Sequence, residues 1–267
     1  MLLIEKMKHK EDFTALERQI SEYILDHRNE IFELSLAEFS SRLYVFKATM
    51  IRYFKKLGFS SYRELCVELA KELSLYENGV HEENGTFFAE SKGADDIAKR
   101  IQLINTTALA ISYEYLNYRE FDEAADILRQ YHRIYLYGCE EAGLAGARRL
   151  FHRLVRSGWD TTLIDTFDKH EERKGSYDRK AIAVFCVYND AEGKAAKMAA
   201  QLHSMSLPVL LLSGPFSNEI DRYAHRILRT MYTEDQTAEG ALGSLSAMEY
   251  LSDVLAYTLL KKTEKTT

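Results

Sequence analysis

The chain has 267 residues, with 35 Lys and Arg against 41 Asp and Glu, which gives a formal net charge of −6. This length suits one or two globular domains, and the acidic charge argues against a protein that coats nucleic acid along its whole surface, although it does not exclude a local basic patch. No apolar run is long enough to span a membrane, and the three cysteines give neither a disulfide framework nor a zinc pattern. We therefore expect a cytoplasmic protein without a metal or a cofactor.

The N-terminal part of the chain predicts helices separated by short breaks. Apolar residues at helical spacing indicate a first helix over about 14–27, and Ser35 is placed to cap a second helix. A third helix follows a break near residues 44–45 and ends at Gly58, and a fourth covers about 61–75. These segments predict a small all-helical domain.

A change in composition separates this domain from the rest of the chain. Residues 77–94 carry glycine, asparagine and acidic residues without periodicity, so they are the predicted linker. The predicted domains are therefore 1–76 and 95–267. The second of these begins with a long helical pattern over about 95–130.

Beyond Arg133 the pattern changes to short apolar runs that alternate with helical segments. The run over 181–187 is apolar throughout, which is typical of a strand that is buried on both faces. Strands that alternate with helices predict a parallel α/β sheet. The predicted strands cover about 134–137, 161–164, 181–187, 209–212 and 227–228, and the predicted helices about 141–156, 191–205 and 240–261.

The helical domain contains one strongly basic window. From Phe39 to Arg63 there are six basic residues and no acidic residue. The third helix has Met50, Phe54 and Leu57 on one face and basic residues on the other, which suits insertion into the DNA major groove, where Lys and Arg neutralise phosphates. A solvated basic face on a helical bundle is the alternative. The candidate DNA-contacting residues are Lys47, Ala48, Thr49, Arg52, Lys55 and Lys56.

Two runs of this domain follow a known family pattern. Ala48 to Phe59 reads ATMIRYFKKLGF, and Thr14 to Leu25 reads TALERQISEYIL. Together they resemble the helix-turn-helix of RpiR-type bacterial transcriptional regulators over about residues 13–75. The chain departs from that pattern at the turn, where Tyr44 stands in place of a usual glycine and Phe46 in place of a usual serine. We therefore expect a strained turn and a missing helix cap.

The resemblance also implies an architecture for the second domain. RpiR-type regulators carry a C-terminal sugar isomerase (SIS) domain, a flavodoxin-like parallel sheet that senses phosphosugars, and the layout of residues 107–245 resembles it. The implied fold class is α + α/β, with an all-helical helix-turn-helix domain before a SIS domain. The implied partner is double-stranded operator DNA with a palindromic sequence. The regulator is expected to be a homodimer or homotetramer that controls sugar metabolism genes.

The loops that bind phosphosugars in this family are altered here. The first, close to G-x-G-x-S in the family, reads GCEEA over 138–142, and the second, close to S-x-S-G-x-T, reads CVYNDA over 186–191. Carboxylates at Glu140, Glu141 and Asp190 repel a phosphate, so we expect weak or absent phosphosugar binding. The expected effector is instead a neutral or cationic small molecule, or the site takes none. The positions that the resemblance assigns to the effector are Gly138, Cys139, Glu140, Ala142, Tyr188, Asn189 and Ser213.

Two alternative functions stay open at this point. A sugar-phosphate isomerase needs a positioned general base and a bound phosphate. No histidine–carboxylate pair is identifiable from the spacing, and a helix-turn-helix has no role in such an enzyme, so no catalytic residue is expected. The other alternative is a regulator whose SIS domain only dimerises, through the apolar surface of the helices over about 95–130 and 240–261.

Overall fold

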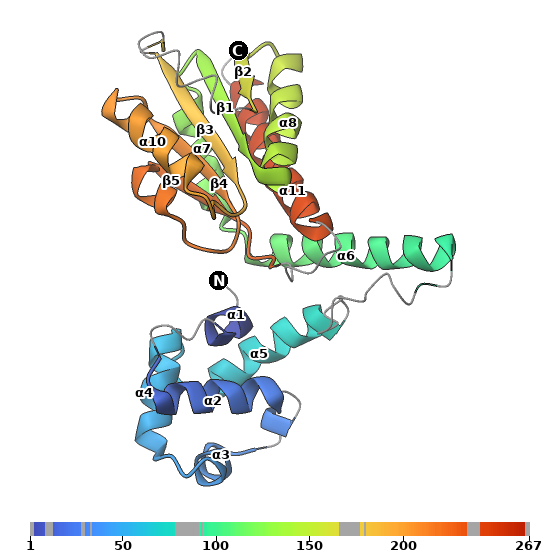
Figure 1. The fold of residues 1–267 in the computed structure, drawn as a ribbon, viewed down its shortest axis with the longest axis vertical. Coiled ribbons are helices and arrows are strands. Elements are labelled where there is room, and N and C mark those ends of the chain that lie inside the picture. Colours follow the sequence, from blue (N-terminus) through green and yellow to red (C-terminus); the bar gives the residue numbers. More distant parts are fainter. Residues whose placement is uncertain are drawn as a thin grey trace. The chain divides into compact units, whose positions relative to one another are not determined.

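The computed structural model divides the chain into two units, Met1–Asn78 and Gly79–Thr267, each with buried hydrophobic residues of its own (Figure 1). It describes residues 3–8, 13–27, 30–32, 34–77, 91, 93–165, 177–178, 180–233 and 241–264. The predicted boundary at residue 76 falls inside a helix that continues to Glu77, and most of the predicted linker 77–94 lies outside the described residues.

The first unit is entirely helical where the structure describes it. Side-chain caps begin two of its helices: Thr14 with Glu17, and Ser35 with Glu38, form capping boxes in which each pair exchanges hydrogen bonds with the other's backbone N–H. Gly58 ends a third helix with φ 102°, as the sequence predicts. The elements are α1 (Leu3–Lys8), α2 (Ala15–Asp26), η1 (Glu30–Phe32), α3 (Leu36–Arg42), α4 (Lys47–Leu57) and α5 (Tyr62–Glu77).

The sequence pattern does not predict α1, because its stabilising partner lies far along the chain. The Glu72 carboxylate of α5 accepts hydrogen bonds from the backbone N–H groups of Leu3 and Ile4, the latter at 2.9 Å. These groups begin α1 and have no acceptor within that helix. Glu72 is 1% exposed, and burial raises the pKa of its carboxyl to about 7.

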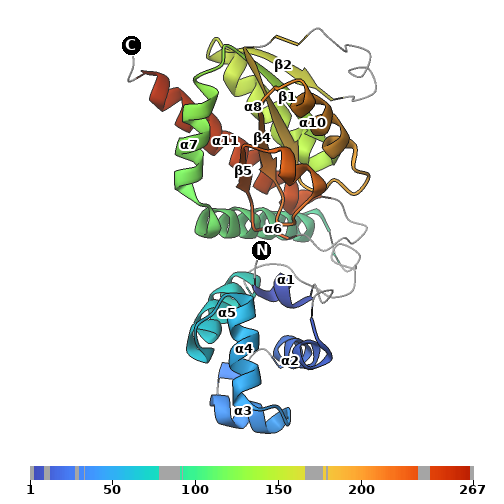
Figure 2. The same cartoon turned by 90° about the vertical axis from the view of Figure 1, so that its left-hand side faces the viewer.

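The second unit is built on a five-stranded parallel sheet with the strand order β2-β1-β3-β4-β5 (Figures 1 and 2). This is the α/β architecture that the sequence predicts. The strands are β1 (Arg133–Cys139), β2 (Asp160–Ile164), β3 (Ala181–Val187), β4 (Val209–Ser213) and β5 (Arg226–Arg229). The remaining elements are α6 (Ala94–Tyr115), α7 (Tyr118–Leu128), α8 (Glu140–Arg156), α10 (Lys194–Ser204), η2 (Glu219–Tyr223) and α11 (Leu242–Glu264).

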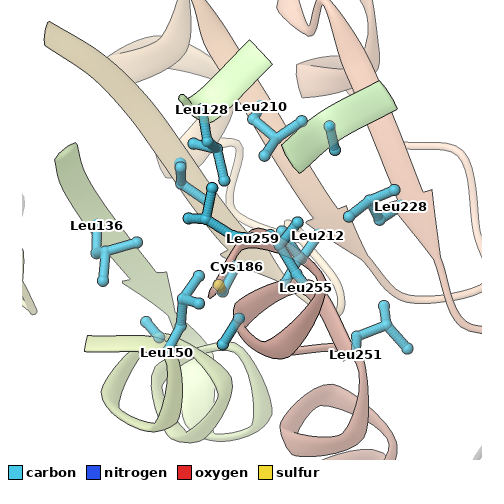
Figure 3. Packing of buried hydrophobic residues seen from close by; sticks show 14 of the residues in the cluster. Leu128, Leu136, Leu150, Cys186, Leu210, Leu212, Leu228, Leu251, Leu255 and Leu259 are labelled. Atoms are coloured by element: carbon cyan, nitrogen blue, oxygen red, sulfur yellow. The ribbon is translucent and has the colours of Figure 1, made fainter. Parts of the chain in front are cut away.

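Alternate strand residues bury two separate hydrophobic layers, one on each face of the sheet. On one face, Leu136, Cys186 and Leu210 pack with residues of α7, α8 and α11 (Figure 3). On the other face, Tyr137 and Phe185 pack with residues of α10 and η2. The run 181–187 therefore has no solvent-facing side, which explains its continuous apolar sequence.

Two predicted helices have different limits in the structure. The pattern over 95–130 forms two helices, α6 and α7, because Leu116 is extended (φ −70°, ψ 135°) and buries its side chain at the break. The helix predicted over 191–205 begins only at Lys194, after Gly193 with φ 65°. None of the helices in the described ranges is long and apolar enough to cross a membrane.

The raised pKa of Glu72 predicts that the helical unit loses stability as pH rises. The folded state holds the Glu72 proton up to about pH 7, whereas the unfolded chain releases it near pH 4.5. The free energy of unfolding therefore falls as the pH rises between these two values. We expect the free energy of opening of α1 and α5, measured by hydrogen exchange, to fall by about 2–3 kcal/mol from pH 5 to pH 8.

Glu72→Gln should remove most of this pH dependence, since the amide does not titrate. Glu64→Gln on the same helix is the matched control, because hydrogen bonds from Ser60 lower the pKa of Glu64. Protection that increases with pH in the unaltered chain would contradict the prediction.

Candidate functional site

The two faces of α4 separate apolar from basic residues as the sequence predicts. Met50, Phe54 and Leu57 are buried, and Tyr53 joins them beneath the helix with its hydroxyl hydrogen-bonded to Ser21. The opposite face carries the candidate DNA-contacting residues. Of these, Thr49 is half-buried and the others are exposed, namely Lys47, Ala48, Arg52, Lys55 and Lys56.

The start of α4 is suited to receive an anion. Unlike α2 and α3, it has no side-chain cap and no acidic residue in its first turn. Within the described part of the chain, no acidic group pairs with Lys47, Arg52 or Lys55, and Arg52 donates only to the Thr49 hydroxyl, at 3.3 Å. The positive end of the helix dipole and these side chains therefore present positive charge to solvent.

Lys56 differs from its neighbours because it is bound within the unit. Its ammonium lies 2.9 Å from a Glu17 carboxylate oxygen and 5.2 Å from the centre of the Phe13 ring. These contacts connect the end of α4 to the start of α2. Lys56 therefore has a structural partner that Lys55, one residue earlier, does not share.

The turn before α4 has the geometry that its unusual residues predict. Tyr44 adopts φ 54°, a left-handed conformation that glycine accepts more easily, and its backbone N–H donates to Ser41 O at 3.2 Å. Phe46 stands at the N-cap with no side-chain hydrogen bond. Both aromatic side chains project into solvent, with 96% of Tyr44 and 84% of Phe46 exposed.

In the second unit, the predicted effector residues meet at the carboxyl edge of the sheet. In the register of the sheet, Cys139, Val187 and Ser213 are neighbours across β1, β3 and β4. The chain runs from β1 outward to β2 and then returns to β3 on the other side of β1. The ends of β1 and β3 therefore form the switch point where open α/β sheets bind their ligands. The predicted residues gathered at this edge are Gly138, Cys139, Glu140, Ala142, Tyr188, Asn189 and Ser213.

The carboxylate of Glu140 lies at this switch point and binds both loops. Its Oε1 accepts hydrogen bonds from the backbone N–H of Tyr188 at 2.6 Å and of Gly143 at 3.1 Å. The N–H groups of Asn189 and Ala142 also favour its charged form. Although much of the residue faces solvent, desolvation at the carboxylate prevails and raises the pKa of Glu140 to about 7.

A second carboxylate, that of Asp190, binds the backbone N–H groups at the start of α10. Asp190, three residues beyond the end of β3, accepts hydrogen bonds from the backbone N–H of Ala195 at 3.1 Å and of Ala196 at 2.8 Å. These N–H groups belong to the first turn of α10. A bound phosphate would use such groups, so both helix starts beside the switch point are occupied by carboxylates of the chain itself.

Two hydroxyl groups at this edge also have partners within the unit. The Ser213 hydroxyl is buried and accepts a hydrogen bond from Arg229 at 3.3 Å. The Arg229 guanidinium also binds the Asp221 carboxylate at 2.7 Å. The Tyr188 hydroxyl donates to the carbonyl oxygen of Tyr232 at 3.0 Å. These hydroxyl groups therefore stabilise the loops.

Comparison with known families identifies the helical unit. Residues 1–75 match the model described as the helix-turn-helix domain of the rpiR family. The chain carries an rpiR-family helix-turn-helix domain. Relatives named as uncharacterized HTH-type transcriptional regulators extend the similarity beyond this domain. One from Thermotoga maritima is 24% identical over 97% of this chain and 92% of its own, and one from Haemophilus influenzae is 20% identical over 96% and 88%.

Solved structures share the fold of the helical unit and of the unit that follows it. The Vibrio vulnificus NanR protein, complexed with ManNAc-6P, has a TM-score of 0.57 and 17% identity and covers 98% of this chain and 93% of its own. A putative sugar-phosphate isomerase from Listeria monocytogenes has a TM-score of 0.57 and 13% identity, and covers 65% of this chain and 94% of its own. The rpiR-family helix-turn-helix domain is thus followed by a unit that shares the fold of these structures.

The sequence analysis missed two residues whose contacts shape this edge of the sheet. Gly143 is one of them, because a Cβ there would lie 2.2 Å from the carbonyl oxygen of Cys186 and 2.5 Å from Glu140 Oε1. Arg229 is another, since its partners Ser213 and Asp221 come from separate segments. A glycine inside a predicted helix is the one sequence feature that indicates the first of these contacts.

Gly143→Ala should destabilise the second unit, because its Cβ would overlap a backbone oxygen that has little room to move. We expect a loss of about 1–3 kcal/mol in the free energy of unfolding, measured by urea denaturation with the fluorescence of Trp159. Gly93→Ala is the matched control, since a Cβ at Gly93 meets nothing within 4 Å. Equal stability of the two variants would contradict the close approach of Gly143 to the carbonyl oxygen of Cys186.

Proposed function

We propose that the protein is a DNA-binding transcriptional regulator of RpiR type that controls sugar metabolism genes, with a SIS unit that does not take ordinary phosphosugars. The observation that carries the first part is the basic face of α4 within a domain that matches the rpiR family over residues 1–75. The relatives named as HTH-type transcriptional regulators support it.

The proposed DNA-contacting residues are those on the outer face of α4. Lys47, Arg52 and Lys55 neutralise phosphates, and the small side chains of Ala48 and Thr49 allow base edges to approach. Lys56 is left out of this set, since its ammonium already binds Glu17. The acidic net charge of the chain is compatible with this role because the window from 39 to 63 holds no acidic residue.

The proposed mode of DNA binding uses an oligomer with two-fold symmetry. A homodimer or homotetramer with two-fold symmetry would present two α4 helices to a palindromic operator, with half-sites about 34–36 Å apart. Exposed apolar side chains on α6 and α11 support such an assembly, among them Leu103, Tyr113 and Tyr257. A SIS unit that serves only for dimerisation remains the second candidate, and the same exposed residues favour it.

For the effector site, the contacts of Glu140 and Asp190 support the absence of phosphosugar binding. The NanR structure contains ManNAc-6P, and the Listeria protein is a putative sugar-phosphate isomerase, so related folds handle such ligands. In this chain two carboxylates hold the N–H groups that would bind a phosphate. We assign no catalytic role, because an isomerase needs that phosphate to position its substrate.

Single substitutions on α4 test the DNA contacts. Arg52→Ala and Lys55→Ala should each weaken binding to a duplex selected from a random pool by the full chain, by about tenfold. The slope of log K against log salt should become shallower by about 0.9 for each phosphate that the variant no longer neutralises. Fluorescence anisotropy at several salt concentrations measures both quantities.

Lys56→Ala is the control for these variants, since it removes the same charge one residue away from Lys55 but from a side chain bound to Glu17. We expect it to lower stability by about 0.2–1 kcal/mol and to change DNA affinity less. An equal loss of affinity for Lys55→Ala and Lys56→Ala would contradict the assignment of separate roles.

Glu140→Gly tests whether the Glu140 carboxylate prevents a phosphate from binding the backbone N–H groups at the switch point. This change removes the carboxylate from the backbone N–H groups and puts glycine at a position with φ 49°. Titration calorimetry with a panel of hexose and pentose phosphates should give no measurable binding to the unaltered chain and measurable binding to this variant. Glu141→Gly, which removes a carboxylate from the same turn without opening the site, should behave like the unaltered chain. Micromolar binding to the unaltered chain would contradict the proposal.

A further inference from the structure

Two exposed aromatic side chains stand directly before the proposed recognition helix. Tyr44 is 96% exposed and Phe46 is 84% exposed. The next most exposed large hydrophobic residue in the described part of the helical unit is Val67, at 51%. Neighbouring apolar groups that remain in water at this level mark a surface that a partner covers.

The turn that carries these side chains is held rigidly by its own hydrogen bonds. Val45, between the two aromatic residues, is 5% exposed. Its backbone N–H donates to Ser40 O at 3.0 Å, and its carbonyl oxygen accepts from the Ser40 hydroxyl at 2.7 Å. Because Val45 is fixed inward, the residues on either side of it are fixed outward. The turn would have to break the hydrogen bonds of Val45 to bury the side chains of Tyr44 and Phe46.

The surroundings of the turn identify the chemistry of the partner. Lys47 follows Phe46 directly, Arg52 and Lys55 lie on the same helix, and the first turn of α4 has no acidic residue. This combination of apolar and positive groups fits a polyanion that also exposes apolar groups. The major groove of DNA is such a surface, since the C5-methyl groups of thymine project into it between two rows of phosphates.

We propose that Tyr44 and Phe46 contact thymine methyl groups in the operator and so contribute to its sequence specificity. The inference rests on the proposed function, because it requires α4 to enter the major groove. N-terminal residues of a recognition helix are those that reach base edges in this mode of binding, and Phe46 is the N-cap of α4. Small polar residues at these two positions would leave the methyl groups without an apolar contact.

The test uses the full chain and a duplex that it selects from a random pool. Each thymine in the selected sequence is replaced in turn by uracil, which removes only the methyl group. For the unaltered chain we expect affinity to fall about fourfold for each removed methyl group that an aromatic side chain touches, at one or two positions in each half-site. Phe46→Ser and Tyr44→Gly should lower affinity for the thymine duplex and abolish the response to uracil at those positions.

Loss of folding does not explain the expected result. Phe46→Ser supplies a side-chain cap that α4 lacks, and Tyr44→Gly relieves the positive φ, so neither variant should melt at a lower temperature. Phe32→Ser is the matched control, since Phe32 is an exposed phenylalanine of the same unit, 40% exposed, outside the turn. It should leave both the affinity and the uracil response unchanged.

The outcomes separate this inference from the proposed function. If selection enriches no sequence, the proposed function fails and the inference with it. If a sequence is selected but Phe46→Ser and Tyr44→Gly bind it and respond to uracil as the unaltered chain does, the inference alone is overturned. A change in oligomeric state in these variants, measured by sedimentation with DNA affinity unchanged, would overturn it in favour of a contact between copies of the chain.

Discussion

The Glu140 carboxylate joins the two loops on which the second unit depends. It is attached to the first residue of α8 and accepts hydrogen bonds from backbone N–H groups that follow β1 and β3. N–H groups at a helix start have no acceptor within the helix, so some anion or polar group must satisfy them. Because a side chain does so here, a carboxyl group of the chain itself occupies the edge where open α/β sheets bind ligands, and its raised pKa of about 7 makes its negative charge depend on pH.

Acidic side chains also bind backbone N–H groups at the starts of α2, α3 and α10, and among the described residues no such contact is present at the start of α4. Glu17 and Glu38 complete capping boxes at α2 and α3, and Asp190 binds the first turn of α10. The start of α4, in contrast, has no carboxylate and no side-chain cap. Positive helix ends are thus neutralised at α2, α3 and α10, and left open at the helix proposed to meet DNA phosphates.

The sequence predicts the fold well because its decisive patterns are local. The capping pair Thr14 and Glu17 and the apolar run 181–187 can both be recognised within a few residues. The contacts that escaped prediction join distant segments. Glu72 binds the start of α1, and Glu140 binds the backbone of Tyr188. Both contacts join residues that are far apart in the sequence, and hydrophobic periodicity does not indicate such contacts. For the proposed effector site, the sequence indicated which residues lie at this edge but not that the Glu140 carboxylate binds the backbone N–H groups of both loops.

One nucleotide has large consequences at position 140. Glutamate and glycine codons differ at their second base alone, so a single transition separates this chain from one whose amide groups at the switch point are free. The φ of 49° at Glu140 is already a conformation that glycine adopts without strain. A gene that encodes this unit can therefore remove this carboxylate from the N–H groups of Tyr188 and Gly143 in one mutational step, with the backbone already in a shape that glycine adopts.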